Sequence, residues 1–131
     1  MYEIMATKTF EEQFSNLEIK AKTGKLNKNN MILLKKYCHC IFKMIENPFD
    51  NSLGTSPYSV FTNWLTKAKK KKTICYHSYL ENHTSRARRI YWYFDNNKIK
   101  ILGIANHPKS SKEMPKFNNL AKESLLDKEW L

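Results

Sequence analysis

Arginine, histidine and tyrosine side chains concentrate in residues 73–112, and they are the side chains of this chain best suited to chemistry on phosphate esters. Arg86, Arg88 and Arg89 precede a run of aromatic residues, and His107 follows the next apolar run. A guanidinium presents a planar fork of donors that fits a phosphate group. A histidine titrates near neutral pH and can accept or release a proton. These residues therefore favour contact with a phosphate-bearing polyanion.

The charge of the chain points to the same kind of partner. Its 131 residues include 23 Lys and Arg against 12 Asp and Glu, a formal net charge of +11. Such a balance biases the choice of partner toward nucleic acid, an acidic protein or an anionic surface. Residues 69–72 are four consecutive lysines. We take Lys70 and Lys72 as candidate RNA contacts, although a solvated charge run is the commoner meaning of such a tract.

A β-hairpin is expected to position the arginines. Residues 89–94 and 98–105 are mostly β-branched, aromatic or aliphatic, and Asn96-Asn97 between them is typical of a two-residue type I′ turn. Side chains alternate along a strand, so one face belongs to the core: Ile90, Trp92, Phe94, Ile99, Ile101 and Gly103. The opposite face mixes cations, phenols and aliphatic groups and is expected to be open to a polyanion: Arg89, Tyr91, Tyr93, Lys100, Leu102 and Ile104.

Two helices are predicted before the hairpin. A capping box at residues 9–12 begins a helix over 9–22, and Thr23-Gly24 ends it. Asn29 or Asn30 caps a second helix, which ends at Asn47-Pro48. Apolar residues spaced three and four apart mark the buried face of this second helix: Met31, Leu34, Cys38, Ile41 and Ile45.

The remaining segments complete an α+β pattern. Residues 2–6 are compatible with a short strand and residues 73–80 with a longer one, whereas residues 59–71 fit either a helix or an irregular basic loop. A short C-terminal helix is predicted over 117–131. Short connections between sequential strands predict a single domain over 1–131, a small twisted antiparallel sheet packed against an N-terminal helical hairpin.

The order of elements and the hairpin motif resemble the RelE/ParE superfamily of bacterial toxins, and within it the ribonuclease branch (RelE-, HigB- and YhaV-like). The resemblance rests on residues 89–94 (RIYWYF), the short turn at 95–98 and the apolar strand that ends at His107. Asn47-Pro48 after the second helix also looks like a family position. The resemblance implies a RelE-like fold and the toxin of a toxin–antitoxin pair.

The resemblance further implies a metal-independent, cofactor-free endoribonuclease that cuts mRNA, often on the ribosome, through attack by the 2′-hydroxyl. That reaction needs a proton acceptor, cations that stabilise the phosphorane, and an acid for the leaving oxygen. Arg89 and His107 match the family's catalytic positions, and His77 is a further candidate with a partly buried structural role as its alternative. The expected RNA contacts are Arg86, Arg88, Tyr91, Lys100, Lys109, Lys112, Lys70 and Lys72.

The chain departs from the family pattern in two places. Some members carry a catalytic tyrosine shortly after the His107 position, but residues 110–113 here are Ser, Ser, Lys and Glu. The hairpin register also places His107 on the face opposite Arg89. Either Gly103 marks a β-bulge that resets the alternation, or His107 has already left the strand.

Several other classes of protein are disfavoured. Cys38 and Cys40 on one helix point ~200° apart, which does not suit a zinc site, and three glycines leave no glycine-rich phosphate loop. No segment approaches the ~20 apolar residues of a membrane span, and residues 1–14 lack a signal-peptide pattern. We therefore expect a cytoplasmic protein with reduced cysteines, no metal and no membrane partner.

The expected partners are mRNA and an acidic antitoxin that covers the basic surface. Two other functions stay open. The first is a non-catalytic nucleic-acid-binding module that uses the same Arg, Lys and Tyr side chains. The second is a toxin of the same fold that acts on a protein such as gyrase, for which neither Arg89 nor His107 need be catalytic.

Overall fold

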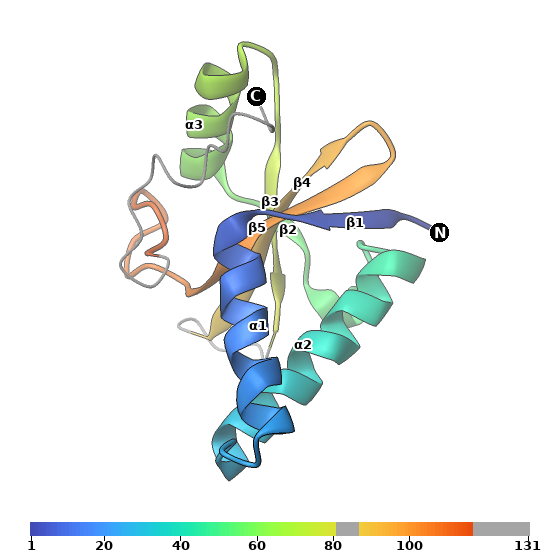
Figure 1. Ribbon diagram of the computed structural model, residues 1–131. Helices are drawn as coiled ribbons and strands as arrows, with labels where there is room; N and C mark the ends of the chain where they lie inside the picture. The colour runs from blue at the N-terminus through green and yellow to red at the C-terminus, as the bar shows by residue number, and fades with distance from the viewer. Residues whose placement is uncertain (81–86, 117–131) are drawn as a thin grey trace.

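A computed structural model describes residues 1–80 and 87–116 and has an α+β architecture (Figure 1). In chain order the described residues form β1 (Glu3–Ala6), α1 (Lys8–Lys22), α2 (Lys28–Glu46), the 3-10 helix η1 (Asn51–Leu53), β2 (Ser56–Pro57), α3 (Ser59–Lys69), β3 (Cys75–Tyr79), β4 (Arg88–Asp95) and β5 (Lys98–Asn106). The predicted C-terminal helix at 117–131 and Arg86 lie outside the described residues.

The strands form one open sheet in the order β1-β5-β4-β3-β2. Neighbours from β5 to β2 are antiparallel, but β1 runs parallel to β5, with Glu3 opposite Lys98. The Thr7 N–H continues this pairing by donating to the Ile101 carbonyl at 3.0 Å. The prediction of a wholly antiparallel sheet is therefore wrong for β1. It assumed that strands pair in sequential order, whereas the first strand pairs with the last.

The β4–β5 hairpin contains a β-bulge. Its register follows the prediction near the turn, but farther on Tyr91 lies opposite Gly103, so β5 carries Leu102 as one extra residue. Ile90 consequently pairs with Ile104 and not with Gly103 as predicted. The bulge resets the alternation along β5. Because of this reset, Ala105 lies opposite Arg89, and His107, two residues farther on, is on the same face of the sheet as Arg89.

The hairpin turn itself differs from the prediction. Asn96 has a φ of 56°, and Asn97 is not among the described residues with positive φ. A type I′ turn requires positive φ at both central residues, whereas a type II′ turn requires it only at the first. The turn therefore resembles type II′ and not type I′, because only its first central residue has a positive φ.

The two N-terminal helices form as predicted, but their N-caps lie two or three residues earlier than Thr9 and than Asn29 or Asn30. Thr7 caps α1, and its hydroxyl accepts a backbone N–H of the first turn; Asn27 caps α2 in the same way. The predicted ends of the helices are confirmed, with Gly24 at a φ of 68° after α1 and Asn47 after α2.

The buried face of α2 is rotated by one residue from the predicted stripe. Its buried side chains are also spaced three and four apart: Leu33, Tyr37, Cys40 and Met44. Met31 and Cys38 of the predicted stripe are exposed. Both stripes have helical periodicity. The stripe that packs against the sheet is the one that contains Tyr37 and Met44.

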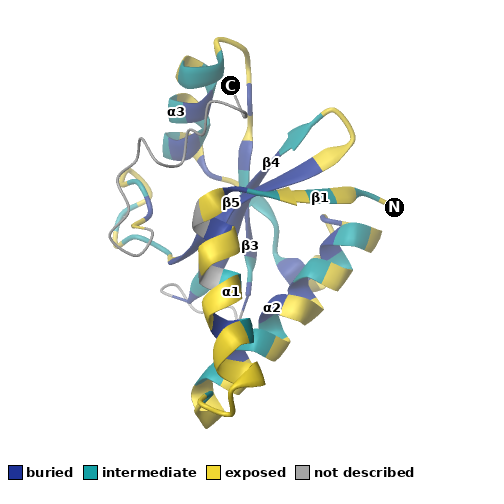
Figure 2. Ribbon diagram, in the orientation of Figure 1, coloured by how far each residue is buried: buried dark blue, intermediate teal, exposed yellow. Residues whose placement is uncertain are grey.

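Two cores lie on opposite faces of the sheet, and the strands between them are the most buried part of the molecule (Figure 2). Helices α1 and α2 cover the first face, where the buried sheet residues are Ser78, which accepts a hydrogen bond from Trp92, and five apolar residues: Ile90, Trp92, Ile99, Ile101 and Ile104. Helix α3 contributes Phe61 and Leu65 to the core on the second face.

The expectation that the second face is open to a polyanion is wrong. Residues 59–69 form a helix, and its apolar stripe packs over Tyr91 and Tyr93, which are fully buried. Within residues 1–80 and 87–116, the structure contains no helix with the length and apolarity needed to cross a membrane.

Candidate functional site

The predicted site residues are divided between the two ends of the β4–β5 hairpin. At about 3.3 Å per residue, the eight residues of β4 separate these ends by roughly 23 Å. Lys70 and Lys72 are exposed. They lie at the turn end, because the Nζ of the preceding Lys69 is 5.3 Å from the Tyr93 ring centre. Arg88 and His107 lie at the other end. The predicted RNA contacts therefore do not form one surface.

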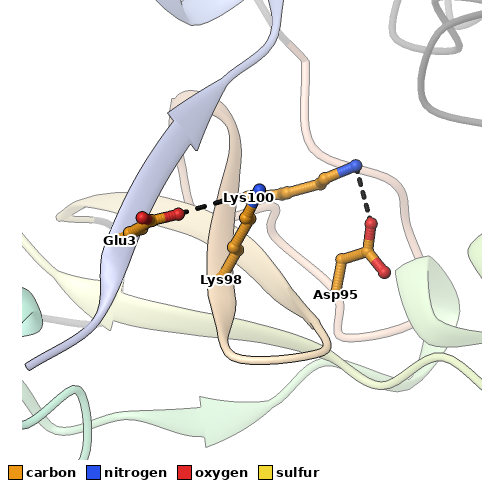
Figure 3. A network of polar contacts seen from close by, with 4 residues as sticks. All are labelled: Glu3, Asp95, Lys98 and Lys100. Carbon is orange, nitrogen blue, oxygen red and sulfur yellow. Dashed lines mark ion pairs between the residues drawn. The ribbon is translucent and has the colours of Figure 1, made fainter.

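Lys100 occupies a buried ion pair at the turn end. It is 7% exposed, and its Nζ lies 2.8 Å from Oδ2 of Asp95 (Figure 3). The hydrogen bond from Lys100 holds the pKa of Asp95 below its usual value. Lys100 was predicted to contact RNA, but its burial against Asp95 makes it a structural residue. Tyr91 is fully buried under α3 and is likewise withdrawn from the RNA-contact surface.

Four aromatic rings meet at the opposite end of the hairpin. Tyr58 precedes α3, His77 is in β3, Tyr91 is in β4 and His107 follows β5. The Tyr58 ring centre lies 5.3 Å from that of His77 and 5.4 Å from that of His107, and the two imidazoles are 5.5 Å apart. We call these four residues the histidine cluster. Segments distant in the sequence thus bring the two candidate histidines together.

His107 is half-buried and held by its backbone and its ring. Its N–H donates to the Ala87 carbonyl at 3.3 Å, and its Nδ1 lies 2.8 Å from the Pro108 carbonyl oxygen. Because a carbonyl oxygen only accepts hydrogen bonds, this contact requires the proton of the neutral imidazole on Nδ1. Nε2 is then left with a lone pair. The local backbone therefore selects the tautomer in which Nε2 acts as a proton acceptor.

His77 is more deeply buried than His107. It is 8% exposed, and its Nδ1 lies 3.3 Å from the Ser56 hydroxyl oxygen. Burial lowers its pKa to about 4, with the charges of Arg89 and His107 acting in the same direction. His77 is therefore neutral at pH 7 and a weak base. It supports the ring of His107 and is poorly suited to accept a proton itself.

Arg89 points into the protein. It is 3% exposed, its Nη1 donates to the Ala87 carbonyl at 2.7 Å, and its guanidinium lies 4.2 Å from the Tyr79 ring centre. Arg89 was predicted to be a catalytic cation that contacts phosphate, but a side chain buried in this way does not present its donors to a ligand at the surface. Its charge acts instead on neighbouring groups such as His77.

The cations of this end, of which Arg88 is half-buried and Lys109 exposed, border two clefts. Arg88 alternates with Arg89 along β4 and lines a cleft of about 370 Å³. His107 and Lys109 line another of about 520 Å³. Lys112 is exposed in the segment that follows. Lys109 and Lys112 are thus exposed in the segment that follows His107, and Arg88 lines the neighbouring cleft; their contact with RNA stays a prediction.

Tyr58 is a member of the cluster that the sequence analysis did not identify. Its hydroxyl donates to the carbonyls of Glu113 and Ser110, the latter at 3.4 Å, and burial raises its pKa. Tyr58 is thereby tied to residues 110–113, the segment that follows His107. The sequence did contain a signal for Tyr58. Tyr58, Phe61 and Leu65 have the spacing of one helix face, and all three are buried in the core on the second face of the sheet.

Metal ligands do not gather in the described part of the chain, where no group of three His, Cys, Asp or Glu side chains is placed to hold an ion. Cys40 is buried, with Sγ 3.7 Å from the Tyr79 carbonyl oxygen, and burial raises its pKa to about 12. Cys38 is exposed on another side of the same helix.

No protein-family model, curated protein or solved structure matches this chain.

Proposed function

We propose that this protein is a metal-independent endoribonuclease that cuts mRNA and acts as the toxin of a toxin–antitoxin pair with a RelE-like fold. One observation carries the proposal. The contact between Nδ1 of His107 and the Pro108 carbonyl leaves Nε2 as a proton acceptor in a side chain that lines a cleft with Lys109. A proton acceptor beside cations is what cleavage by a 2′-hydroxyl requires.

In the proposed reaction, Nε2 of His107 accepts the proton of the 2′-hydroxyl. The 2′-oxygen attacks the adjacent phosphorus, and the bond from phosphorus to the 5′-oxygen breaks. The products are a 2′,3′-cyclic phosphate and a 5′-hydroxyl, whose proton comes from the protonated imidazole or from water. Lys109, the next cation along the same cleft, stabilises the charge that develops on the phosphorane.

Other residues around His107 act as positioning residues. The Ala87 carbonyl accepts hydrogen bonds from both Arg89 Nη1 and the His107 N–H, so the start of β4 and the end of β5 share one anchor. Tyr58 packs its ring edge against His107 and fixes the segment that follows it. These contacts limit the orientations of the imidazole, which proton transfer at a fixed distance requires.

The partners in this proposal are mRNA, free or on the ribosome, and an acidic antitoxin in the cytoplasm. The net charge of +11 supports both, since each partner is a polyanion or an acidic surface. The charge by itself does not separate an enzyme from a binding protein.

A non-catalytic nucleic-acid-binding module is the second candidate. The burial of Arg89 favours it, because the predicted phosphate clamp does not face the surface. In a binding module His107 is dispensable, whereas loss of Arg88 weakens binding and lowers its salt dependence.

Induced expression in a bacterial host, with mapping of mRNA 5′ ends, separates these functions. We expect new 5′ ends with the wild type, and their loss with His107→Ala. His39→Ala is the matched control, since His39 is exposed on α2, and we expect it to cut like the wild type. Growth arrest with intact mRNA would contradict the proposal and indicate a protein target such as gyrase. No change in growth or RNA would favour the binding module.

A further inference from the structure

The two clefts at the His107 end of the sheet adjoin each other. Asn106 and Lys116 line both of them. The 520 Å³ cleft contains His107, and the 370 Å³ cleft extends from the shared residues to α1 and the first turn of α2. In Figure 1 the segment that follows β5, drawn in orange to red, leaves the sheet beside α1. The shared residues place the two clefts next to each other at this end of the sheet.

Helix α1 forms one wall of the smaller cleft. Asn16 and Lys20 both line it, and residues four apart lie on the same face of a helix. Lys22, two residues farther on, is exposed but does not line this cleft. The other walls come from Asn30 in the first turn of α2 and from Arg88 in β4.

The lining of the smaller cleft has a consistent chemistry. It includes apolar and aromatic residues such as Leu33 and Tyr37, and the described residues that line the cleft include no carboxylate. Its other polar side chains are three cations and three amides: Lys20, Arg88, Lys116, Asn16, Asn30 and Asn106. The positive end of the α2 helix dipole lies at the same place, since Asn30 is in its first turn. Cations select phosphate groups, and amides can donate to phosphates or pair with base edges.

We infer that the two clefts form one binding groove for single-stranded RNA, in which the smaller cleft holds the nucleotides that flank the one at His107. This inference rests on the proposed function, because RNA is the ligand in both. A groove lined by cations that follows the backbone is the usual way to hold a single strand. The inference adds Lys20, Lys116 and the amides of Asn16 and Asn30 to the RNA-binding surface, and none of these was assigned from the sequence.

The test is a titration of a short, fluorescently labelled, single-stranded RNA with 2′-O-methyl groups at every position, followed by anisotropy at several salt concentrations. This RNA cannot be cut through a 2′-hydroxyl, so binding is read without catalysis. The variants are Lys20→Ala and its control Lys22→Ala, which remove the same charge from the same helix. Both residues are exposed, so we expect both variants to fold.

We expect Lys20→Ala to weaken binding about threefold to tenfold and to lower the slope of log K against log salt by about one, since one phosphate contact is lost. Lys22→Ala should bind like the wild type. Equal effects of the two variants would overturn the inference, because binding would then depend on net charge and not on the cleft. Absence of RNA binding by the wild type would overturn it as well.

The outcome separates this inference from the proposed function. Binding that depends on Lys20, in a protein that cuts no RNA, would support the groove and contradict the enzyme. Cleavage that depends on His107 but is unchanged in binding and rate by Lys20→Ala would support the enzyme and overturn the groove.

Discussion

The two faces of the sheet bury different kinds of side chain. The face under α1 and α2 holds a continuous apolar core centred on Trp92, which is fully buried. The face under α3 also buries three side chains that can carry charge, His77, Arg89 and Lys100. Burying a charge costs free energy that pairing recovers only in part, whereas burying apolar surface is favourable. The comparison indicates that the first face supplies stability. On the second face, the buried His77 contacts the His107 ring, and the buried Arg89 shares the Ala87 carbonyl with His107, whereas Lys100 is paired with Asp95.

The largest stability effect is expected on the first face. Trp92 packs against Tyr76 and Phe94, with ring centres 4.9 Å and 5.0 Å away, and its Nε1–H donates to the Ser78 hydroxyl at 2.9 Å. Trp92→Ala should lower the free energy of unfolding by about 3–5 kcal/mol, measured by urea denaturation. If that variant does not fold, Ile101→Val should cost about 0.5–1.5 kcal/mol. A loss below about 0.5 kcal/mol in both would contradict the assignment of stability to this face.

The next effect concerns pH and the second face. Burial favours the neutral form of His77, so its pKa in the folded protein is about 4, below the ordinary 6.5. As pH falls below 6.5, the unfolded chain takes up a proton that the folded chain does not, and stability decreases until about pH 4. The loss amounts to roughly 3 kcal/mol.

Denaturation midpoints from pH 7 to pH 4 measure this contribution. His77→Gln should remove most of the loss in this range, while His39→Gln, a change at an exposed histidine, should leave it in place. Identical pH profiles for the two variants would show that His77 is not held neutral by the fold.

A smaller effect is expected at the buried ion pair of the second face. The pKa of Asp95 is lowered by its hydrogen bond from Lys100, so the stability that it contributes is present above the ordinary pKa of 3.8 and is lost as pH falls through the lower folded value. Asp95→Asn should lower the free energy of unfolding at pH 7 by about 1–2 kcal/mol, because Lys100 stays buried beside a neutral partner.

Glu3→Gln is the control for this change. The ion pair between Glu3 and Lys98 is longer, at 3.7 Å, and both side chains are at least half exposed. Thermal or urea denaturation should show a change of at most about 0.5 kcal/mol. An effect of Glu3→Gln as large as that of Asp95→Asn would mean that burial does not distinguish the two ion pairs.

Local features of the fold could be predicted from the sequence. The hairpin, the two N-terminal helices and the short first strand were identified because turns, caps and periodicity act over a few residues. The pairing of β1 with β5 was not, since the direction of a four-residue edge strand depends on the whole fold. The burial of Cys40 instead of Cys38 also escaped prediction, because both lie on apolar stripes with the same spacing.

The candidate site was predicted only in part. His107 and the bulge that resets its face could be inferred from the apolar strand and Gly103, although the extra residue of β5 is Leu102. The inward direction of Arg89 could not, because it depends on contacts such as that with the Tyr79 ring of the neighbouring strand β3. Lys20 lies far from the hairpin in sequence and joins the site only through tertiary contacts.

The most direct test of this account is cleavage of a defined RNA by the purified protein in the presence of a metal chelator. A second RNA, with one 2′-deoxynucleotide at the cleavage position, serves as the substrate control. We predict that the wild type cuts only the first RNA and leaves a 2′,3′-cyclic phosphate. His107→Ala should be about 10²–10⁴ times slower, with an unchanged free energy of unfolding. Cleavage of the deoxy RNA, or equal rates for the wild type and His107→Ala, would contradict the assignment of His107 as the proton acceptor.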